Sequence, residues 1–175
     1  MEKPQFDLNG PMFDVSQGNA VIKVTEVKSV LRQMAQMGLS TLMLYCEDSF
    51  DVKNQPYFGY MRSRYTEADM KECDDYADLF GIEMIPCIQT LAHLSTIGRW
   101  GKFPMDTRDI LLANWDRTYE LIDKMFSTLS KCFKTRKIHV GMDEAYMLGR
   151  GKHLDLHGYE PISSIMKRHL DRVCE

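Results

Sequence analysis

The sequence predicts an α/β fold, a partial (β/α)8 TIM-type barrel of about four βα units with parallel strands. Short apolar segments alternate with longer amphipathic segments, which is the pattern of parallel strands joined by right-handed helical crossovers. Three of the apolar segments end in polar residues followed by long loops, namely Glu47-Asp48, Gln89 and Asp143-Glu144. Functional groups at the carboxyl ends of several strands favour a barrel, while an open doubly wound sheet stays the alternative.

We expect residues 1–175 to form a single domain, of which residues 1–11 are an irregular lead-in. A whole barrel needs about 250 residues, so the chain is long enough for only part of one. Strands are predicted at residues 12–16, 41–46, 83–89 and 137–142. Helices are predicted to follow them at residues 26–37, 67–80, 115–131 and 163–173.

Turn and cap residues mark where these elements begin and end. Thr25 is expected to cap the first helix and Gly38 to end it. Thr66, with Asp69 at the third position after it, is an acidic variant of a capping box for the second helix. Pro86 is unfavourable in a central strand, so it predicts a bulge or a strand end close to the site.

Composition and charge argue against several classes of function. The net charge is −3 and charges of both signs are mixed along the chain, so we expect no nucleic-acid partner. No apolar stretch is long enough to span a bilayer and no secretory leader is visible at Met1, so we expect no membrane association. The five cysteines are widely spaced and lack a Cys-x-x-Cys motif, which indicates buried thiols in a reducing, cytoplasmic environment.

Two adjacent carboxylates, Asp143 and Glu144, follow the fourth predicted strand and precede a loop with several glycines. At a strand end of a barrel, both can act on the same small ligand. If both project into one pocket, their like charges couple and the pKa of one rises toward a useful proton-donor value. The plain alternative is an ordinary Asp-Glu dipeptide at the start of a surface loop.

His153 and His157 have the i, i+4 spacing that can hold zinc on a helix. Glycines bracket them and no third ligand is evident, whereas zinc takes three or four protein ligands, so a solvated loop–helix junction is the better interpretation. No phosphate-binding glycine motif follows any predicted strand. We therefore expect no metal and no cofactor.

Four segments, in their order and spacing, carry a resemblance to a known family. They are residues 42–48 (LMLYCED), 56–62 (PYFGYMR), 85–94 (IPCIQTLAHL) and 139–145 (HVGMDEA). From about Phe13 onward the chain resembles the first half of the catalytic barrel of family 20 glycoside hydrolases, the β-N-acetylhexosaminidases, and particularly a compact bacterial branch. The resemblance implies an exo-acting enzyme that removes terminal GlcNAc or GalNAc from an N-acetylhexosamine-containing glycan.

The resemblance implies a role for each of the two carboxylates. Glu144 would start protonated, protonate the leaving-group oxygen and later activate water. Asp143 would hold the substrate's 2-acetamido group, whose carbonyl oxygen attacks the anomeric carbon to form an oxazolinium ion. Neither acid is the attacking group in this substrate-assisted, retaining mechanism, so they can be neighbours in the chain. Asp143 should stay ionised beside the developing positive charge.

The resemblance also points to residues at the other strand ends. Asp48 and His93 match an Asp–His pair that lies behind the proton donor and tunes its pKa. Trp100 is a candidate to stack on a sugar face, with packing between loops as the equal alternative. Gln17 follows the first strand, where the family usually carries an arginine that binds sugar hydroxyls. A glutamine lacks the charged fork of an arginine, which leaves substrate recognition open.

The second half of the family's barrel, which contributes a tyrosine and tryptophans around the acetamido group, has no counterpart in these residues. An open half-barrel exposes its inner apolar face and two strand edges. The rival hypothesis is therefore a truncated, inactive or self-associating fragment that forms a homodimer or pairs with a second-half chain. A third is a flavodoxin-like sheet that binds a small ligand without sugar chemistry.

Overall fold

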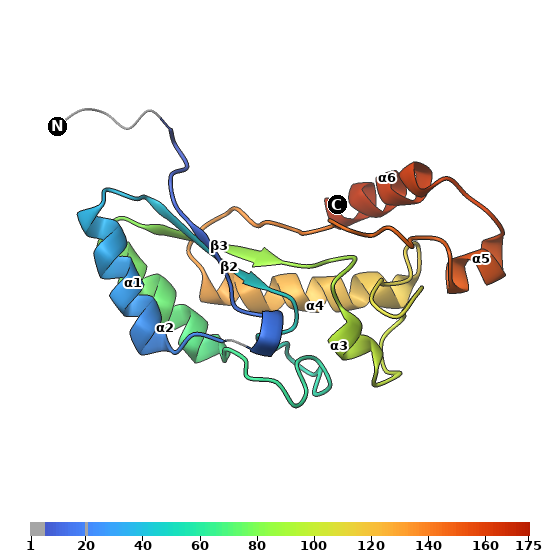
Figure 1. Cartoon of the computed structure of the whole chain (residues 1–175), viewed down its shortest axis with the longest axis horizontal. Coiled ribbons are helices and arrows are strands. Elements are labelled where there is room, and N and C mark those ends of the chain that lie inside the picture. The colour runs from blue at the N-terminus through green and yellow to red at the C-terminus, as the bar shows by residue number, and fades with distance from the viewer. Residues whose placement is uncertain (1–5, 20) are drawn as a thin grey trace.

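The computed structural model describes residues 6–19 and 21–175 (Figure 1). Its strands are β1 (Met12–Asp14), β2 (Thr41–Cys46) and β3 (Glu83–Ile88). Its helices are α1 (Val24–Gln36), α2 (Glu67–Asp78), α3 (Ser95–Gly98), α4 (Asp116–Cys132), α5 (Lys152–His157) and α6 (Ile162–Val173), with a 3-10 turn, η1, at Gln17–Asn19. Residues 6–11 of the predicted lead-in carry no helix or strand, and residues 1–5 lie outside the described part.

Within the described residues, the strands form one parallel sheet in the order β1-β2-β3. β2 and β3 pair without interruption from Thr41↔Glu83 to Cys46↔Ile88. In Figure 1, α1, α2 and α4 lie along one face of this sheet, while α5 and α6 lie toward the carboxyl end of β3. Parallel strands joined by helices confirm the predicted α/β organisation.

The sequence predicted the end of α1 correctly but not its start. Lys23 is the N-cap residue and no side chain caps the helix, so the prediction of Thr25 as the cap is wrong. At the other end Gly38 has a φ of 69°, and the Leu39 amide donates to the Met34 carbonyl at 3.0 Å. Glycine enters this left-handed conformation without steric cost, so Gly38 ends the helix as predicted.

Helix α2 begins with the predicted capping box. The Asp69 amide donates to Thr66 Oγ1 at 3.1 Å, and the Thr66 amide donates to Asp69 Oδ2 at 2.9 Å. Two amides that would otherwise lack partners are satisfied reciprocally. Gly81, at a φ of 66°, reverses the chain after the helix and leads it into β3.

The predicted fourth strand, residues 137–142, is only partly formed. It makes one parallel bridge to β3, in which His139 N donates to the Pro86 carbonyl at 2.9 Å and Ile88 N donates to the His139 carbonyl at 3.0 Å. The nitrogen and carbonyl of one residue point to the same side of a strand, so Pro86 turns its nitrogen toward this segment and offers it no donor. Gly141 then leaves the extended conformation at a φ of 41°.

Pro86 does not interrupt β3 itself. The register between β2 and β3 runs straight through the Leu44↔Pro86 pair, and the strand ends at Ile88. Because the proline nitrogen faces away from β2, the β2–β3 ladder loses no hydrogen bond. The prediction of a bulge or a strand end at Pro86 is therefore wrong.

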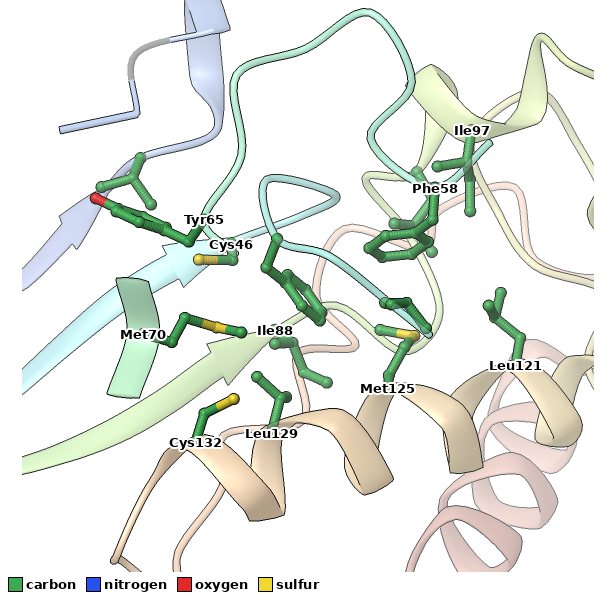
Figure 2. Packing of buried hydrophobic residues seen from close by; sticks show 14 of the residues in the cluster. Cys46, Phe58, Tyr65, Met70, Ile88, Ile97, Leu121, Met125, Leu129 and Cys132 are labelled. Carbon is green, nitrogen blue, oxygen red and sulfur yellow. The ribbon is translucent and has the colours of Figure 1, made fainter. Parts of the chain in front are cut away.

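The main core lies between the sheet, α4 and the long loop after β2 (Figure 2). Met125 and Leu129 of α4 pack in the same cluster as Ile88 of β3. Phe50 and Phe58 of the long loop are fully buried and pack edge to face, with ring centroids 5.2 Å apart. Aromatic burial of this kind anchors the loop, so the residues after β2 are held by the core rather than left to solvent.

Several smaller observations complete the fold. The short helices α3 and α5 lie in regions that the sequence analysis assigned to loops. All five cysteines are free, and four of them are buried, namely Cys46, Cys73, Cys87 and Cys132. None of the helices in the described residues is long and apolar enough to cross a membrane.

Candidate active site

Asp143 and Glu144 lie in the turn that follows the segment beside β3. Gln89, the residue after β3, donates from Nε2 to Asp143 Oδ1 at 2.8 Å. Gly141 lets the chain approach β3 closely, because a Cβ at this position would lie 2.2 Å from the Ile88 carbonyl oxygen. The acid pair is therefore seated directly against the carboxyl end of β3.

His93, in the loop after β3, joins the two acids in one cluster. Its Nε2 lies 3.4 Å from Asp143 Oδ2 and 3.7 Å from Glu144 Oε2. Both acid side chains are 59% exposed, so the cluster is open to a ligand. His93 and Glu144 have φ values of 57° and 53°, a conformation that costs non-glycine residues about 1–2 kcal/mol each. The structure thus brings three of the predicted site residues together.

The surroundings of Asp143 favour its ionised form. The hydrogen bond from Gln89 lowers the pKa of Asp143, and the nearby His93 imidazole lowers it further. An ionised carboxylate at this position suits a group that must face developing positive charge.

Asp48 does not pair with His93, which corrects the expectation from the resemblance. Asp48 is buried, and its Oδ1 lies 3.1 Å from Nε of Arg62, a residue of the long loop after β2. Arg62 Nη2 also donates to the Ser16 carbonyl. Among the described residues, no hydrogen bond or ion pair joins Asp48 to His93. A buried carboxylate needs a cation, and a guanidinium is always charged whereas an imidazole is not.

A chain of hydrogen bonds links the ends of the strands. Gln17 Nε2 donates to Glu47 Oε1 at 2.6 Å, and the Tyr45 hydroxyl donates to the same oxygen at 3.5 Å. Gln89 Nε2 donates to the Tyr45 hydroxyl oxygen at 2.9 Å as well as to Asp143. The network therefore runs from the turn after β1 to the acid pair. Burial raises the pKa of Glu47 above its ordinary value.

Three residues of this network were not predicted as site residues, namely Tyr45, Glu47 and Gln89. Glu47 and Gln89 gave a signal, because each is the first polar residue after an apolar strand. Polar residues at strand ends favour a barrel over an open sheet, but they do not by themselves assign a role to Glu47 or Gln89. Tyr45 gave little signal, since a tyrosine within an apolar strand is equally consistent with ordinary packing.

Comparison with known proteins identifies the family. The family model described as "Glycosyl hydrolase family 20, catalytic domain" matches residues 6–149, which is most of the chain. The chain belongs to glycosyl hydrolase family 20. The match includes the acid pair and all four segments on which the resemblance was based.

Curated relatives of this family 20 chain are similar over most of its length. Beta-hexosaminidase 3 of Arabidopsis thaliana is 28% identical over 158 residues, which cover 82% of this chain and 29% of the relative. Hexosaminidase D of Bos taurus is 26% identical over 145 residues, which cover 74% of this chain and 39% of the relative. The chain therefore spans well under half the length of either relative.

Solved family 20 structures show the same fold. A β-N-acetylhexosaminidase matches with a TM-score of 0.80 at 16% identity, covering 99% of this chain and 45% of that chain. A mutant Streptomyces plicatus β-hexosaminidase in complex with the product GlcNAc matches with a TM-score of 0.75 at 21% identity, covering 98% and 38%. These proteins have the TIM-barrel fold, so the predicted partial barrel is confirmed.

In this family 20 chain, Trp100 packs against other aromatic side chains. Its ring centroid lies 4.9 Å from that of Tyr60, in an edge-on arrangement, and 6.3 Å from that of Tyr57. The two tyrosines belong to the loop after β2 and Trp100 follows α3, so the rings join two loops. These contacts agree with the packing interpretation, while Tyr60 remains 46% exposed and keeps ring surface available to a ligand.

In the described part of this family 20 chain, no group of three or more His, Cys, Asp or Glu side chains is placed to hold a metal ion. His153 and His157 do lie together, with ring centroids 4.9 Å apart. His153 is buried, however, and its Nε2 lies 3.0 Å from Glu160 Oε2. The interpretation of a solvated junction is thus wrong for His153, whose amide donates to the buried Asp106 at 2.8 Å.

Proposed function

We propose that the catalytic domain to which this chain contributes is an exo-acting β-N-acetylhexosaminidase that removes terminal GlcNAc or GalNAc. The observation that carries the proposal is the Asp143–Glu144 pair, gathered with His93 at the end of β3 and open to solvent. Family membership and the hexosaminidase names of the relatives support it. This chemistry needs no cofactor, because the substrate supplies its own nucleophile.

Asp143 orients the 2-acetamido group of the substrate. The carbonyl oxygen of that group attacks the anomeric carbon, and positive charge develops on the amide as the oxazolinium ion forms. A carboxylate whose pKa is held low by Gln89 stays ionised there and stabilises that charge. Water then opens the intermediate, and the configuration at the anomeric carbon is retained.

Glu144 donates a proton to the glycosidic oxygen and afterwards takes one from the attacking water. Its Oε2 lies 3.7 Å from His93 Nε2, and the same nitrogen lies 3.4 Å from Asp143. An imidazole placed near both carboxylates responds to the change of charge on Glu144 during the reaction. His93 therefore acts as a positioning residue for the two acids.

Two further residues support the site in this proposal. Asp48 holds Arg62 in place through their buried ion pair. Trp100, packed against Tyr60, offers ring surface to the face of a sugar. The free and mostly buried cysteines support a reducing compartment such as the cytoplasm.

Release of nitrophenol from aryl β-N-acetylglucosaminide and β-N-acetylgalactosaminide tests the proposal. Glu144→Gln should lower the rate by about 10²–10⁴-fold, because it removes the general acid. Glu120→Gln is the control, since Glu120 is exposed on α4 and makes no side-chain hydrogen bond or ion pair in the described structure. Equal activity in Glu144→Gln and the wild type would reject the assignment.

A second candidate, a self-associating half-barrel, is favoured by a hollow of about 1120 Å³ next to Asp143. Met12 of β1, Ile138 and Leu170 of α6 line it, and their side chains are 48%, 37% and 42% exposed. A second copy of the chain, or a chain that carries the other half of the barrel, covers this surface. Sedimentation then gives a dimer, whereas a stable and active monomer contradicts this candidate.

A further inference from the structure

Asp106 is a buried residue whose carboxyl group holds the loop that follows the acid pair. Its side chain is 6% exposed. Oδ2 of Asp106 accepts from the Gly149 amide at 2.6 Å, and Oδ1 accepts from the His153 amide at 2.8 Å. Within residues 6–19 and 21–175, no Lys, Arg or His side chain forms an ion pair with Asp106. Both oxygens therefore serve backbone amides, which they bind more strongly than a neutral acceptor would.

The backbone of Asp106 reinforces this attachment. The Lys152 amide donates to the Asp106 carbonyl at 2.9 Å. Gly151 makes the approach possible, because a Cβ at position 151 would collide with the same carbonyl oxygen. Three amides between residues 149 and 153 thus bond to one aspartate.

Asp106 belongs to a hairpin, residues 104–112, that also holds the loop of His93. Two backbone hydrogen bonds join the hairpin to the residues on either side of His93. They run from the amides of Leu111 and Leu94 to the carbonyls of Leu91, at 2.8 Å, and Asp109, at 3.0 Å, respectively. The hairpin is therefore bonded both to the loop that carries His93 and, through Asp106, to the loop that carries Glu144.

An apolar cluster packs the same three segments together. Leu148 of the acid-bearing loop, Leu91 of the His93 loop and Ile110 of the hairpin are all buried in it. Because protein interiors are close-packed, a shift of one segment is transmitted to the others. The hairpin, the His93 loop and the acid-bearing loop form one unit.

Glu144 depends on this unit for its position. Its side chain makes no hydrogen bond in the described part of the chain, and its Oε2 lies 3.7 Å from His93 Nε2. Glu144 and His93 have φ values of 53° and 57°, a conformation that residues other than glycine keep only where their surroundings enforce it. Gln89 holds the residue before Glu144, and Asp106 holds the loop after it.

We propose that Asp106 is a positioning residue that fixes Glu144 opposite His93. Its side chain bonds to neither acid and acts on them through the backbone of the loop. The part that this plays in hydrolysis rests on the proposed function, in which Glu144 protonates the leaving group. A general acid must lie within hydrogen-bond reach of the oxygen that it protonates, so a displaced loop loses the proton transfer.

Nuclear magnetic resonance of the whole chain tests the position of Glu144 without any hydrolysis. Asp106→Asn replaces one acceptor by a donor, so one of the two loop amides loses its partner. That amide should exchange with solvent about tenfold faster. The three-bond coupling between the amide proton and Hα of Glu144 reports its φ, and this coupling should change as the turn relaxes. An unchanged coupling at Glu144 overturns the proposal.

Asp74→Asn is the matched control. Asp74 of α2 is also buried and also accepts a backbone amide, that of Lys134 at 3.2 Å, but it lies near the amino end of β3. This variant should also unfold at lower urea concentration, yet keep the wild-type coupling at Glu144. An equal change of the coupling in Asp74→Asn and Asp106→Asn would show that any loss of stability moves Glu144, which overturns the proposal.

Hydrolysis gives a second measurement that a loss of stability alone would not change. A phenyl leaving group needs the proton of Glu144, whereas a dinitrophenyl group leaves without one. Asp106→Asn should lower kcat for phenyl β-N-acetylglucosaminide by about 10²-fold, the loss that a displacement of about 1 Å can cause. The kcat for the dinitrophenyl substrate should stay close to that of the wild type. An equal loss on both substrates overturns the proposal.

The two proposals fail separately. If wild type and Glu144→Gln are equally active or equally inactive, the proposed hydrolase falls, and the coupling at Glu144 still decides the role of Asp106. If hydrolysis depends on Glu144 while Asp106→Asn matches the wild type in coupling and in leaving-group pattern, the hydrolase stands and the positioning role falls. Should Asp106→Asn fail to fold, Asp106→Ser replaces it, because a hydroxyl oxygen still accepts from one amide.

Discussion

Gln89 donates from Nε2 to Asp143 Oδ1 at 2.8 Å, and the same nitrogen donates to the Tyr45 hydroxyl oxygen at 2.9 Å. Gln89 is fully buried, so its orientation is set by the interior and not by solvent. Asp143, in contrast, is mostly exposed. A fixed buried donor thus holds an exposed acid in one orientation before any ligand arrives, which is the preorganisation that charge stabilisation requires.

Gln89→Met should raise the pKa of Asp143 toward its ordinary value of 3.8, because the amide donor that lowers it is lost. The stability that a depressed pKa contributes is present above that ordinary value and is lost as the pH falls through the folded pKa. In the variant this loss should shrink, because the interval between the unfolded and the folded pKa of Asp143 narrows. A carbon-13 NMR titration of the Asp143 carboxyl measures the change. Gln33→Met, on the exposed side of α1, should leave the titration unaltered.

Gly141→Ala should destabilise the chain by clearly more than Gly38→Ala. Both glycines have positive φ, which costs an alanine about 1–2 kcal/mol. A Cβ at Gly38 meets nothing within 4 Å, whereas one at Gly141 would lie 2.2 Å from the Ile88 carbonyl oxygen. Urea unfolding measures the free energy of unfolding of each variant, and the difference between the two losses is the steric cost of the Cβ at position 141. Equal destabilisation would contradict the close approach of the acid-bearing segment to β3.

Thr66→Ala should lower the free energy of unfolding by about 1 kcal/mol, since it removes the cap of α2. Thr25 provides the comparison, because it lies in the first turn of α1 and caps nothing. Thr25→Ala should be neutral or slightly stabilising, given the higher helix propensity of alanine. Thermal unfolding followed by circular dichroism distinguishes the two. A loss of stability in Thr25→Ala equal to that in Thr66→Ala would count against the observed caps.

His169 should make stability depend on pH between about 6.5 and 4. It is fully buried, with Nε2 3.1 Å from the Thr90 carbonyl oxygen, and burial lowers the pKa of His169 to about 4. Because the pKa of His169 is depressed in the folded state, the contribution of the neutral imidazole to the free energy of unfolding is complete above pH 6.5. That contribution falls as the pH drops toward 4. His169→Gln should reduce this slope by up to about 1.4 kcal/mol per pH unit.

Denaturant unfolding across that pH range measures the slope for His169→Gln. The control is His157→Gln, because His157 is exposed at the end of α5. It should leave the pH dependence close to that of the wild type. An identical pH dependence in the wild type and His169→Gln would show that His169 does not control acid stability.

Features set by neighbouring residues were predictable from the sequence. The capping box of Thr66 and Asp69 and the helix stop at Gly38 each depend on a few consecutive residues. The alternation of strands and helices was predictable for a similar reason, since hydrophobic period is a local property. The closeness of His93 to the acid pair was expected only from the resemblance, because hydrophobic period does not tell which loop residues meet.

Features set by distant residues were not predictable. The ion pair of Asp48 with Arg62 depends on how the long loop after β2 folds back over the strand ends. The burial of His153 depends on Asp106, far away in the sequence. The sequence shows that residue 86 is a proline, but it does not show toward which neighbouring strand the Pro86 nitrogen points. That direction determines which neighbour receives no hydrogen bond from residue 86.

Pro86 carries no N–H, so residues 137–142 lack one of the backbone hydrogen bonds to β3 that a full strand would make. β2 and β3 pair along their full length, whereas the backbone of residues 137–142 bonds to β3 and the residues just after it around His139 and Thr90, with the Lys137 side chain paired to Glu83 at 2.7 Å. Separating residues 137–142 from β3 would break few backbone hydrogen bonds and would leave the pairing of β1, β2 and β3 intact. Asp143 and Glu144 therefore follow a segment that is held to β3 by fewer backbone hydrogen bonds than β2 is, and Pro86 lies at the boundary between the two.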